Sequence, residues 1–143
     1  MAVLIVEDNV DLAESMRMLL ELHGCRARVF LNANDLLERA GSVEPGDILV
    51  TDYYLPDLNG VELIRRVRKQ QPRMQAVLLT GSREEAIQQA ARRLGGCAVL
   101  YKPVEFAELR AHIDAHSAAV EPADVELPPP EELRRGNRPR PAK

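Results

Sequence analysis

Five short, mostly apolar segments recur along the 143-residue chain, four of them apolar at nearly every position, and this feature restricts the possible folds most strongly. They cover residues 2–6, 25–30, 47–51, 76–80 and 97–101. Strands that are apolar throughout are buried on both faces, as in a parallel sheet covered by helices. The second segment alternates instead, with Arg26 and Arg28 between apolar residues, which predicts an edge strand.

The segments between these runs carry apolar residues at helical spacing. The first set is Leu12, Met16, Leu19 and Leu20, with Gly24 as a helix stop. The second includes Leu36, with Asn34 predicted as its N-cap. Further sets occur in residues 61–67, 86–94 and 106–113. Five strand–helix units in strict alternation predict an α/β fold with a doubly wound parallel sheet and right-handed crossovers.

The composition predicts one domain and a tail. With 45% hydrophobic and 29% charged residues, the chain suits a single globular domain, which we place at residues 1–116. Six of the ten prolines lie in residues 121–143, and the basic residues Arg134, Arg135, Arg138, Arg140 and Lys143 follow an acidic stretch. Residues 117–143 are therefore predicted to be a disordered, Pro/Arg-rich tail.

Charge and hydropathy exclude several classes of function. A formal net charge of −3 gives no electrostatic reason to expect nucleic-acid binding. No apolar run approaches the roughly 20 residues that span a bilayer, and the first residues lack the features of a signal peptide. We therefore expect a cytoplasmic protein that does not bind membranes. Cys25 and Cys97 lack metal-ligand spacing, which favours small buried thiols.

Polar side chains follow four of the five predicted strands, where sites form in doubly wound sheets. These residues are Glu7-Asp8, Asp52, Thr80-Gly81 and Lys102-Pro103. Clustered carboxylates repel unless a cation binds them, and a magnesium ion suits a few carboxylates with water and a phosphate oxygen. A lysine and a hydroxyl beside one carboxylate complete a phosphoryl-transfer site in which Asp52 is the nucleophile.

Each of these residues also has an ordinary structural interpretation. Asp8 or Asn9 could cap the first helix, Thr80 could simply end a strand, and Lys102 could be solvated before a turn. The specificity of the prediction lies in their combination at successive strand ends.

Four motifs, LIVEDN, VTDYYLPDLNGVELI, VLLTG and LYKPV, resemble those of the receiver domain of two-component response regulators. The similarity covers about residues 1–116. The chain resembles a stand-alone, chemotaxis-regulator-like receiver, although it could equally be a fragment of a longer protein. The resemblance implies a flavodoxin-like (βα)5 fold with a five-stranded parallel sheet of order 2-1-3-4-5. Strands 2 and 5 would then be opposite edges, so Cys25 and Cys97 are predicted not to pair.

The resemblance also implies roles for individual residues, and it implies a phosphoacceptor rather than a turnover enzyme. Asp52 would accept the phosphoryl group, with Mg²⁺ or Mn²⁺ held by Glu7, Asp8, Asp52 and the main-chain carbonyl of Tyr54. Thr80 and Lys102 would contact the phosphoryl group. Residues with structural roles would be Pro56, Gly60, Gly81 and Pro103, the last following a cis Lys102–Pro103 bond.

The implied partners are a sensor histidine kinase or a histidine phosphotransfer protein, and a downstream protein. The downstream protein would bind the face formed by the fourth helix, fifth strand and fifth helix. The resemblance implies a monomer or a phosphorylation-dependent dimer. Val99 occupies the position where the family usually has an aromatic switch residue, and this departure leaves a role as a phosphate sink or shuttle open.

Three other readings fit the sequence less well. A haloacid-dehalogenase-type enzyme needs a second aspartate where this chain has Tyr54, and the acidic EDNVD stretch would repel the phosphate of a flavin. A receiver fold that serves only as an unphosphorylated interaction module would not need Asp52, Thr80 and Lys102 together.

Overall fold

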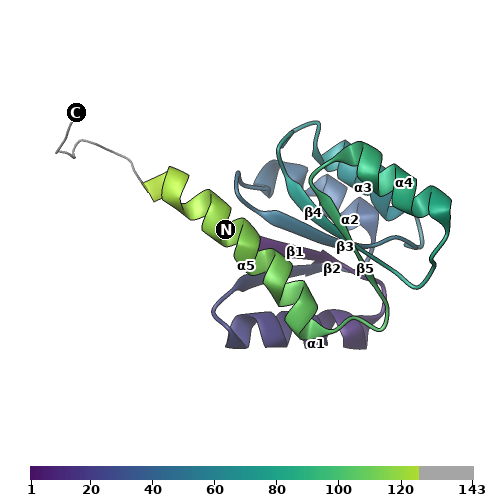
Figure 1. Ribbon diagram of the computed structural model, residues 1–143, viewed down its shortest axis with the longest axis horizontal. Coiled ribbons are helices and arrows are strands. Elements are labelled where there is room, and N and C mark those ends of the chain that lie inside the picture. Colours follow the sequence, from purple (N-terminus) through teal and green to yellow (C-terminus); the bar gives the residue numbers. More distant parts are fainter. Residues whose placement is uncertain (126–143) are drawn as a thin grey trace. The chain divides into compact units, whose positions relative to one another are not determined.

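The structure, a computed structural model, describes residues 1–125 and shows five strands alternating with five α-helices in this part of the chain (Figure 1). The elements are β1 (Ala2–Val6), α1 (Val10–Leu22), β2 (Arg26–Phe30), α2 (Ala33–Glu38), the short 3₁₀ helix η1 (Ala40–Ser42), β3 (Ile48–Asp52), α3 (Gly60–Val67), β4 (Gln75–Thr80), α4 (Glu85–Leu94), β5 (Cys97–Tyr101) and α5 (Phe106–Val125). All five predicted strands are confirmed.

The strands form one parallel sheet in the order β2-β1-β3-β4-β5, as predicted. β2 is an edge strand, which explains its polar alternation. Cys97 lies in β5 at one edge and Cys25 immediately precedes β2 at the other, and both thiols are free and partly buried. Burial raises the pKa of the Cys97 thiol to about 11, so that this thiol is protonated at neutral pH.

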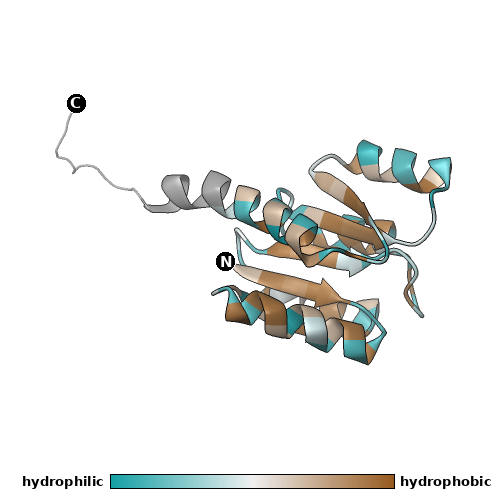
Figure 2. Ribbon diagram, turned by 60° about the horizontal axis from the view of Figure 1, so that its bottom comes forward, coloured by the Kyte–Doolittle hydropathy of each residue, from teal (hydrophilic) through white to brown (hydrophobic). Residues whose placement is uncertain are grey.

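Alternate residues of each strand enter two separate cores on the two faces of the sheet. Leu4 and Leu49 pack with residues of α2, α3 and α4, whereas Ile5 and Val50 pack with Met16 of α1 and with α5. Figure 2 shows the strands as mostly hydrophobic along their length, between helices of mixed colour. Each buried Leu or Ile side chain contributes roughly 1.5–3 kcal/mol of transfer free energy. Burial therefore stabilises the sheet from both of its faces.

Two details of the predicted helices are wrong. Leu19 is 38% exposed, and Ala13 is buried in α1 beside Met16 and Leu20. The N-cap of α2 is Asn32 rather than Asn34, because the Asn32 side chain accepts a hydrogen bond from the Asp35 amide at 2.8 Å. For α1, the cap is Asn9, one of the two alternatives that the sequence left open.

The compact unit Met1–Ile113 contains the whole sheet. A second unit begins at Asp114, and its described residues continue as helix to Val125, beyond the predicted boundary at residue 116. The rest of the predicted tail, residues 126–143, lies outside the described residues, so the tail stays a prediction. None of the helices in the described part of the chain is long and apolar enough to cross a membrane.

Candidate functional site

Three carboxylates meet at the carboxyl ends of β1 and β3. Glu7 and Asp8 directly follow β1, and Asp52 is the last residue of β3. One oxygen of each side chain lies within 4.8 Å of the others. Because β1 and β3 are neighbours in the sheet, these residues converge as the sequence predicted.

The three side chains differ in exposure. Glu7 is 1% exposed and Asp52 is 6% exposed, whereas Asp8 is exposed. Burial of ionised groups is unfavourable unless hydrogen bonds or a counterion compensate for it. The backbone amide of Asn9 donates to Glu7 Oε2 at 3.0 Å, which supplies part of that compensation.

Lys102, which directly follows β5, supplies further compensation. Its Nζ lies 3.0 Å from Glu7 Oε1 and 3.0 Å from Asp52 Oδ2, so that one ammonium group joins two carboxylates. The Lys102–Pro103 bond is cis, as the resemblance implied. The sequence placed Lys102 beside Asp52 but did not reveal its second bond, to Glu7.

Burial determines the titration of the carboxylates. It raises the pKa of both Glu7 and Asp52, although the hydrogen bonds to Lys102 act in the opposite direction. Burial alone would lower the pKa of Lys102, but the hydrogen bonds and charges of the two carboxylates outweigh it and raise the pKa. The cluster therefore favours additional positive charge.

The donor set of this cluster fits a hard divalent cation. All three side chains offer carboxylate oxygens, the ligands that Mg²⁺ prefers, and two of them are buried with a raised pKa. The arrangement is the acidic triad typical of a receiver magnesium site. The fourth predicted ligand is the main-chain carbonyl of Tyr54. Tyr54 lies two positions after Asp52 and is 54% exposed.

Gly60 allows α3 to begin directly against β3. A Cβ at this position would lie 2.5 Å from the main-chain oxygen of Asp52 and 2.8 Å from Leu78 Cδ1. The Gly60 amide also donates to the carbonyl of Tyr53 at 2.8 Å. This close approach supports the predicted role of Gly60 in shaping the loop after the phosphoacceptor candidate.

The other predicted site residues lie around this cluster. Thr80 is the last residue of β4 and is fully buried, one position beyond the Leu79 that pairs with Asp52. Gly81 follows with no atom within 4 Å of a Cβ placed on it. Pro56 lies exposed in the loop between β3 and α3.

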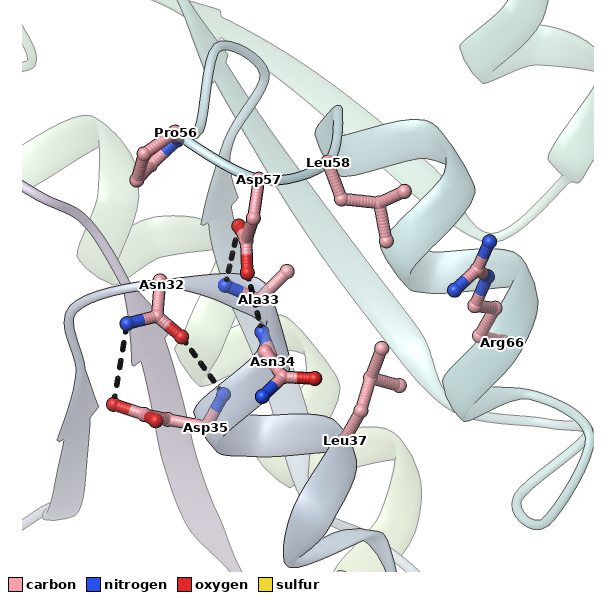
Figure 3. A pocket seen from close by; sticks show the side chains of 9 residues that line it. All are labelled: Asn32, Ala33, Asn34, Asp35, Leu37, Pro56, Asp57, Leu58 and Arg66. Carbon is pink, nitrogen blue, oxygen red and sulfur yellow. Dashed lines mark hydrogen bonds between the residues drawn. The ribbon is translucent and has the colours of Figure 1, made fainter.

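Asp57 is a structurally important residue of this loop that the sequence analysis missed. Its Oδ1 accepts from the Ala33 amide at 3.1 Å and its Oδ2 from the Asn34 amide at 2.9 Å. Figure 3 shows these bonds at one side of a pocket that is also lined by Leu58 and Arg66. Asp57 thus fixes the loop after Asp52 to the first turn of α2. An aspartate after a proline is an ordinary turn residue, so no sequence pattern indicated a partner far along the chain.

Replacing Lys102 tests the electrostatics of the cluster. In metal-free buffer, Lys102→Met is expected to lower the free energy of unfolding by about 1–3 kcal/mol at neutral pH, because Glu7 and Asp52 lose their shared donor. The loss should shrink as the pH falls through the raised carboxyl pKa values, since protonated carboxyls no longer need a counterion.

Denaturant titrations of the wild type and the variant at several pH values measure this difference. Lys69→Met is the matched control, because Lys69 is exposed and lies in the turn that directly follows α3. An equal, pH-independent loss in both variants would contradict the assignment.

The chain is similar to known proteins. The model of the response regulator receiver domain family matches residues 3–114. The transcriptional regulatory protein FixJ of Bradyrhizobium diazoefficiens is 29% identical over 119 residues, which cover 83% of this chain and 58% of FixJ. An uncharacterized 14.6 kDa protein of Leptolyngbya boryana, described by its place in the sodA1 3′ region, is 35% identical over 127 residues, covering 85% of this chain and 94% of that protein.

A crystal structure of FixJ-N superposes with a TM-score of 0.74 at 26% identity, covering 88% of this chain and 97% of that one. The chain thus spans little more than half of the full FixJ regulator but nearly all of FixJ-N. The sheet order, the acidic triad and the family match agree, and the chain belongs to the response regulator receiver domain family.

Proposed function

We propose that Asp52 accepts a phosphoryl group, with Mg²⁺ bound by the acidic triad, and that the protein acts in a two-component phosphorelay. The observation that supports this best is the convergence of Glu7, Asp8, Asp52 and Lys102 within one small cluster at the carboxyl edge of the sheet. Receiver domains are phosphoacceptors rather than turnover enzymes, and they interact with histidine kinases.

The proposed reaction is an in-line transfer to a carboxylate oxygen of Asp52. The oxygen–phosphorus bond forms as the phosphorus–nitrogen bond of a phosphohistidine breaks, and the imidazole leaves with the electron pair. Mg²⁺, held by Glu7, Asp8, Asp52 and the Tyr54 carbonyl, would neutralise charge on the phosphoryl oxygens. Lys102 stays paired with Asp52 and then contacts the phosphoryl group, and Thr80 donates its hydroxyl hydrogen to a phosphoryl oxygen.

The phosphodonor is proposed to be a sensor histidine kinase or a histidine phosphotransfer protein that binds α1, next to the acidic loop. α1 exposes four large apolar side chains: Val10 at 53%, Met18 at 56%, Leu19 at 38% and Leu22 at 78%. Met18 and Leu22 are four residues apart and therefore form one short apolar stripe on the helix surface. Such a stripe suits the packing of a partner helix.

The downstream partner is proposed to bind the face of α4, β5 and α5, near the exposed Arg92 and Arg93. We expect a monomer or a phosphorylation-dependent dimer in the cytoplasm. A role as a phosphate sink or shuttle is the second candidate, because Val99 stands in β5 where relatives usually carry an aromatic switch. Val99 is short and β-branched, so it cannot swing like an aromatic ring.

Phosphorylation itself is tested by mass spectrometry of the intact protein. Incubation with acetyl phosphate and Mg²⁺ should add the mass of one phosphoryl group, and an excess of EDTA should prevent it. An unmodified protein under these conditions would favour the unphosphorylated interaction module.

Amide NMR with beryllofluoride and Mg²⁺ separates signalling from a sink or shuttle. Beryllofluoride mimics the phosphoryl group on the aspartate. If the protein signals through the α4–β5–α5 face, chemical shifts should change beyond the site, through residues 83–101. Shift changes confined to the site would support the sink or shuttle instead.

A further inference from the structure

We propose that Arg83 and Tyr101 together transmit the state of the phosphorylation site to the edge strand β5, in place of the aromatic switch that Val99 lacks. The inference rests on the proposed phosphorylation of Asp52. Its basis is the contact between the two side chains: the Arg83 guanidinium lies over the Tyr101 ring, 4.0 Å from the ring centroid.

Tyr101 is placed next to the site by the register of the sheet. In the β4–β5 ladder, Tyr101 is the direct partner of Thr80, and Lys102 follows it. Tyr101 is two residues from Val99, so both side chains leave β5 on the same face. β5 therefore carries an aromatic ring on the same face as Val99, but two residues closer to the phosphorylation site.

Arg83 is linked to Thr80 through Ser82. The Thr80 hydroxyl accepts a hydrogen bond from the Ser82 amide at 3.0 Å and donates to the Ser82 carbonyl at 3.4 Å. A hydroxyl has only one hydrogen to donate. When Thr80 donates it to a phosphoryl oxygen, the Ser82 carbonyl loses its donor, and the chain immediately before Arg83 must adjust.

The position of Arg83 then reports the state of Thr80. A change in the Ser82 backbone moves Arg83, which is the next residue. The guanidinium then either keeps or loses its contact with the Tyr101 ring. A planar guanidinium stacks on an aromatic face, whereas a lysine ammonium acts as a compact point charge. The pair therefore couples the loop after β4 to β5 through a contact that depends on shape as well as charge.

Tyrosine ring NMR tests this coupling in the whole protein. The chain has three tyrosines, so ring-labelled samples give three assignable sets of signals. The wild type and the variants Arg83→Gln and Arg83→Lys are compared with the control Arg65→Gln, each with and without beryllofluoride and Mg²⁺. Arg65 is also exposed, and it pairs with Glu62 on α3.

Amide signals of the loops after β1 and β3 report loading of the site in every sample. We expect all four proteins to load. The beryllofluoride-dependent shifts of the Tyr101 ring and of the β5 amides should be large in the wild type and in Arg65→Gln. They should be lost in Arg83→Gln and reduced by at least half in Arg83→Lys.

Two results would overturn the inference in distinguishable ways. If Arg83→Gln loads the site and its Tyr101 and β5 shifts equal those of the wild type, the pair does not transmit the signal. If the wild type itself fails to load, the proposed function is wrong and the inference fails with it.

Discussion

Asp8→Ala is expected to abolish phosphorylation by acetyl phosphate and to remove the stabilisation of the protein by Mg²⁺, while the fold persists. Asp8 is the exposed member of the triad, so its loss leaves no buried cavity. It does remove one of the three carboxylates that bring the cation to Asp52. Asp8 also raises the pKa of Asp52 through its charge, so the metal-free variant should be as stable as the wild type or slightly more stable.

Thermal melts with and without Mg²⁺, followed by intact mass after acetyl phosphate treatment, measure both effects. Ligand binding to the native state raises Tm, so a wild-type rise that disappears in the variant identifies a lost metal ligand. Asp11→Ala is the matched control, because Asp11 is an exposed carboxylate in the first turn of α1 outside the triad. An undiminished Mg²⁺-dependent rise in Asp8→Ala would exclude Asp8 as a ligand.

Gly60→Ala is expected to lower the free energy of unfolding by about 1–3 kcal/mol, because the added methyl group overlaps fixed atoms. Its Cβ would lie 2.5 Å from the main-chain oxygen of Asp52, a distance that real Cβ contacts essentially never show. That oxygen belongs to the end of β3, which is held in the middle of the sheet between β1 and β4. The strand cannot move aside without disturbing the site.

Denaturant unfolding of Gly60→Ala beside Gly81→Ala measures this effect. A Cβ on Gly81 meets no atom within 4 Å, so this second substitution should change stability by no more than about 0.5 kcal/mol. Equal stability of Gly60→Ala and the wild type would show that α3 does not approach β3 this closely.

The order and type of the elements were predictable from the sequence because four of the five strands are apolar on both faces and helical periodicity separates all five. Leu4 and Ile5 enter different cores from adjacent positions, so a polar residue was excluded at both. Boundaries were less predictable. Asn34 has the right side chain for an N-cap, but it lies inside α2, where its backbone amide donates a hydrogen bond to the carboxylate of Asp57, a residue 23 positions away.

The candidate site was predictable to the extent that it depends on strand ends. Asp52 and Lys102 converge because β3 and β5 point the same way in one sheet. The contacts that involve loop conformation were not predictable. Neither the bond from Lys102 to the buried Glu7 nor the stacking of Arg83 on Tyr101 has a sequence pattern, because both depend on how a loop turns after its strand.

The central claim is that Asp52 carries the phosphoryl group, and chemical trapping tests it most directly. Borohydride reduces an aspartyl phosphate to homoserine, which peptide mapping locates. After treatment with acetyl phosphate and Mg²⁺, we predict homoserine at position 52, and none at position 8 or in samples prepared with EDTA. Homoserine at another aspartate, or a phosphorylated protein with no homoserine, would contradict the assignment of Asp52 as the phosphoacceptor.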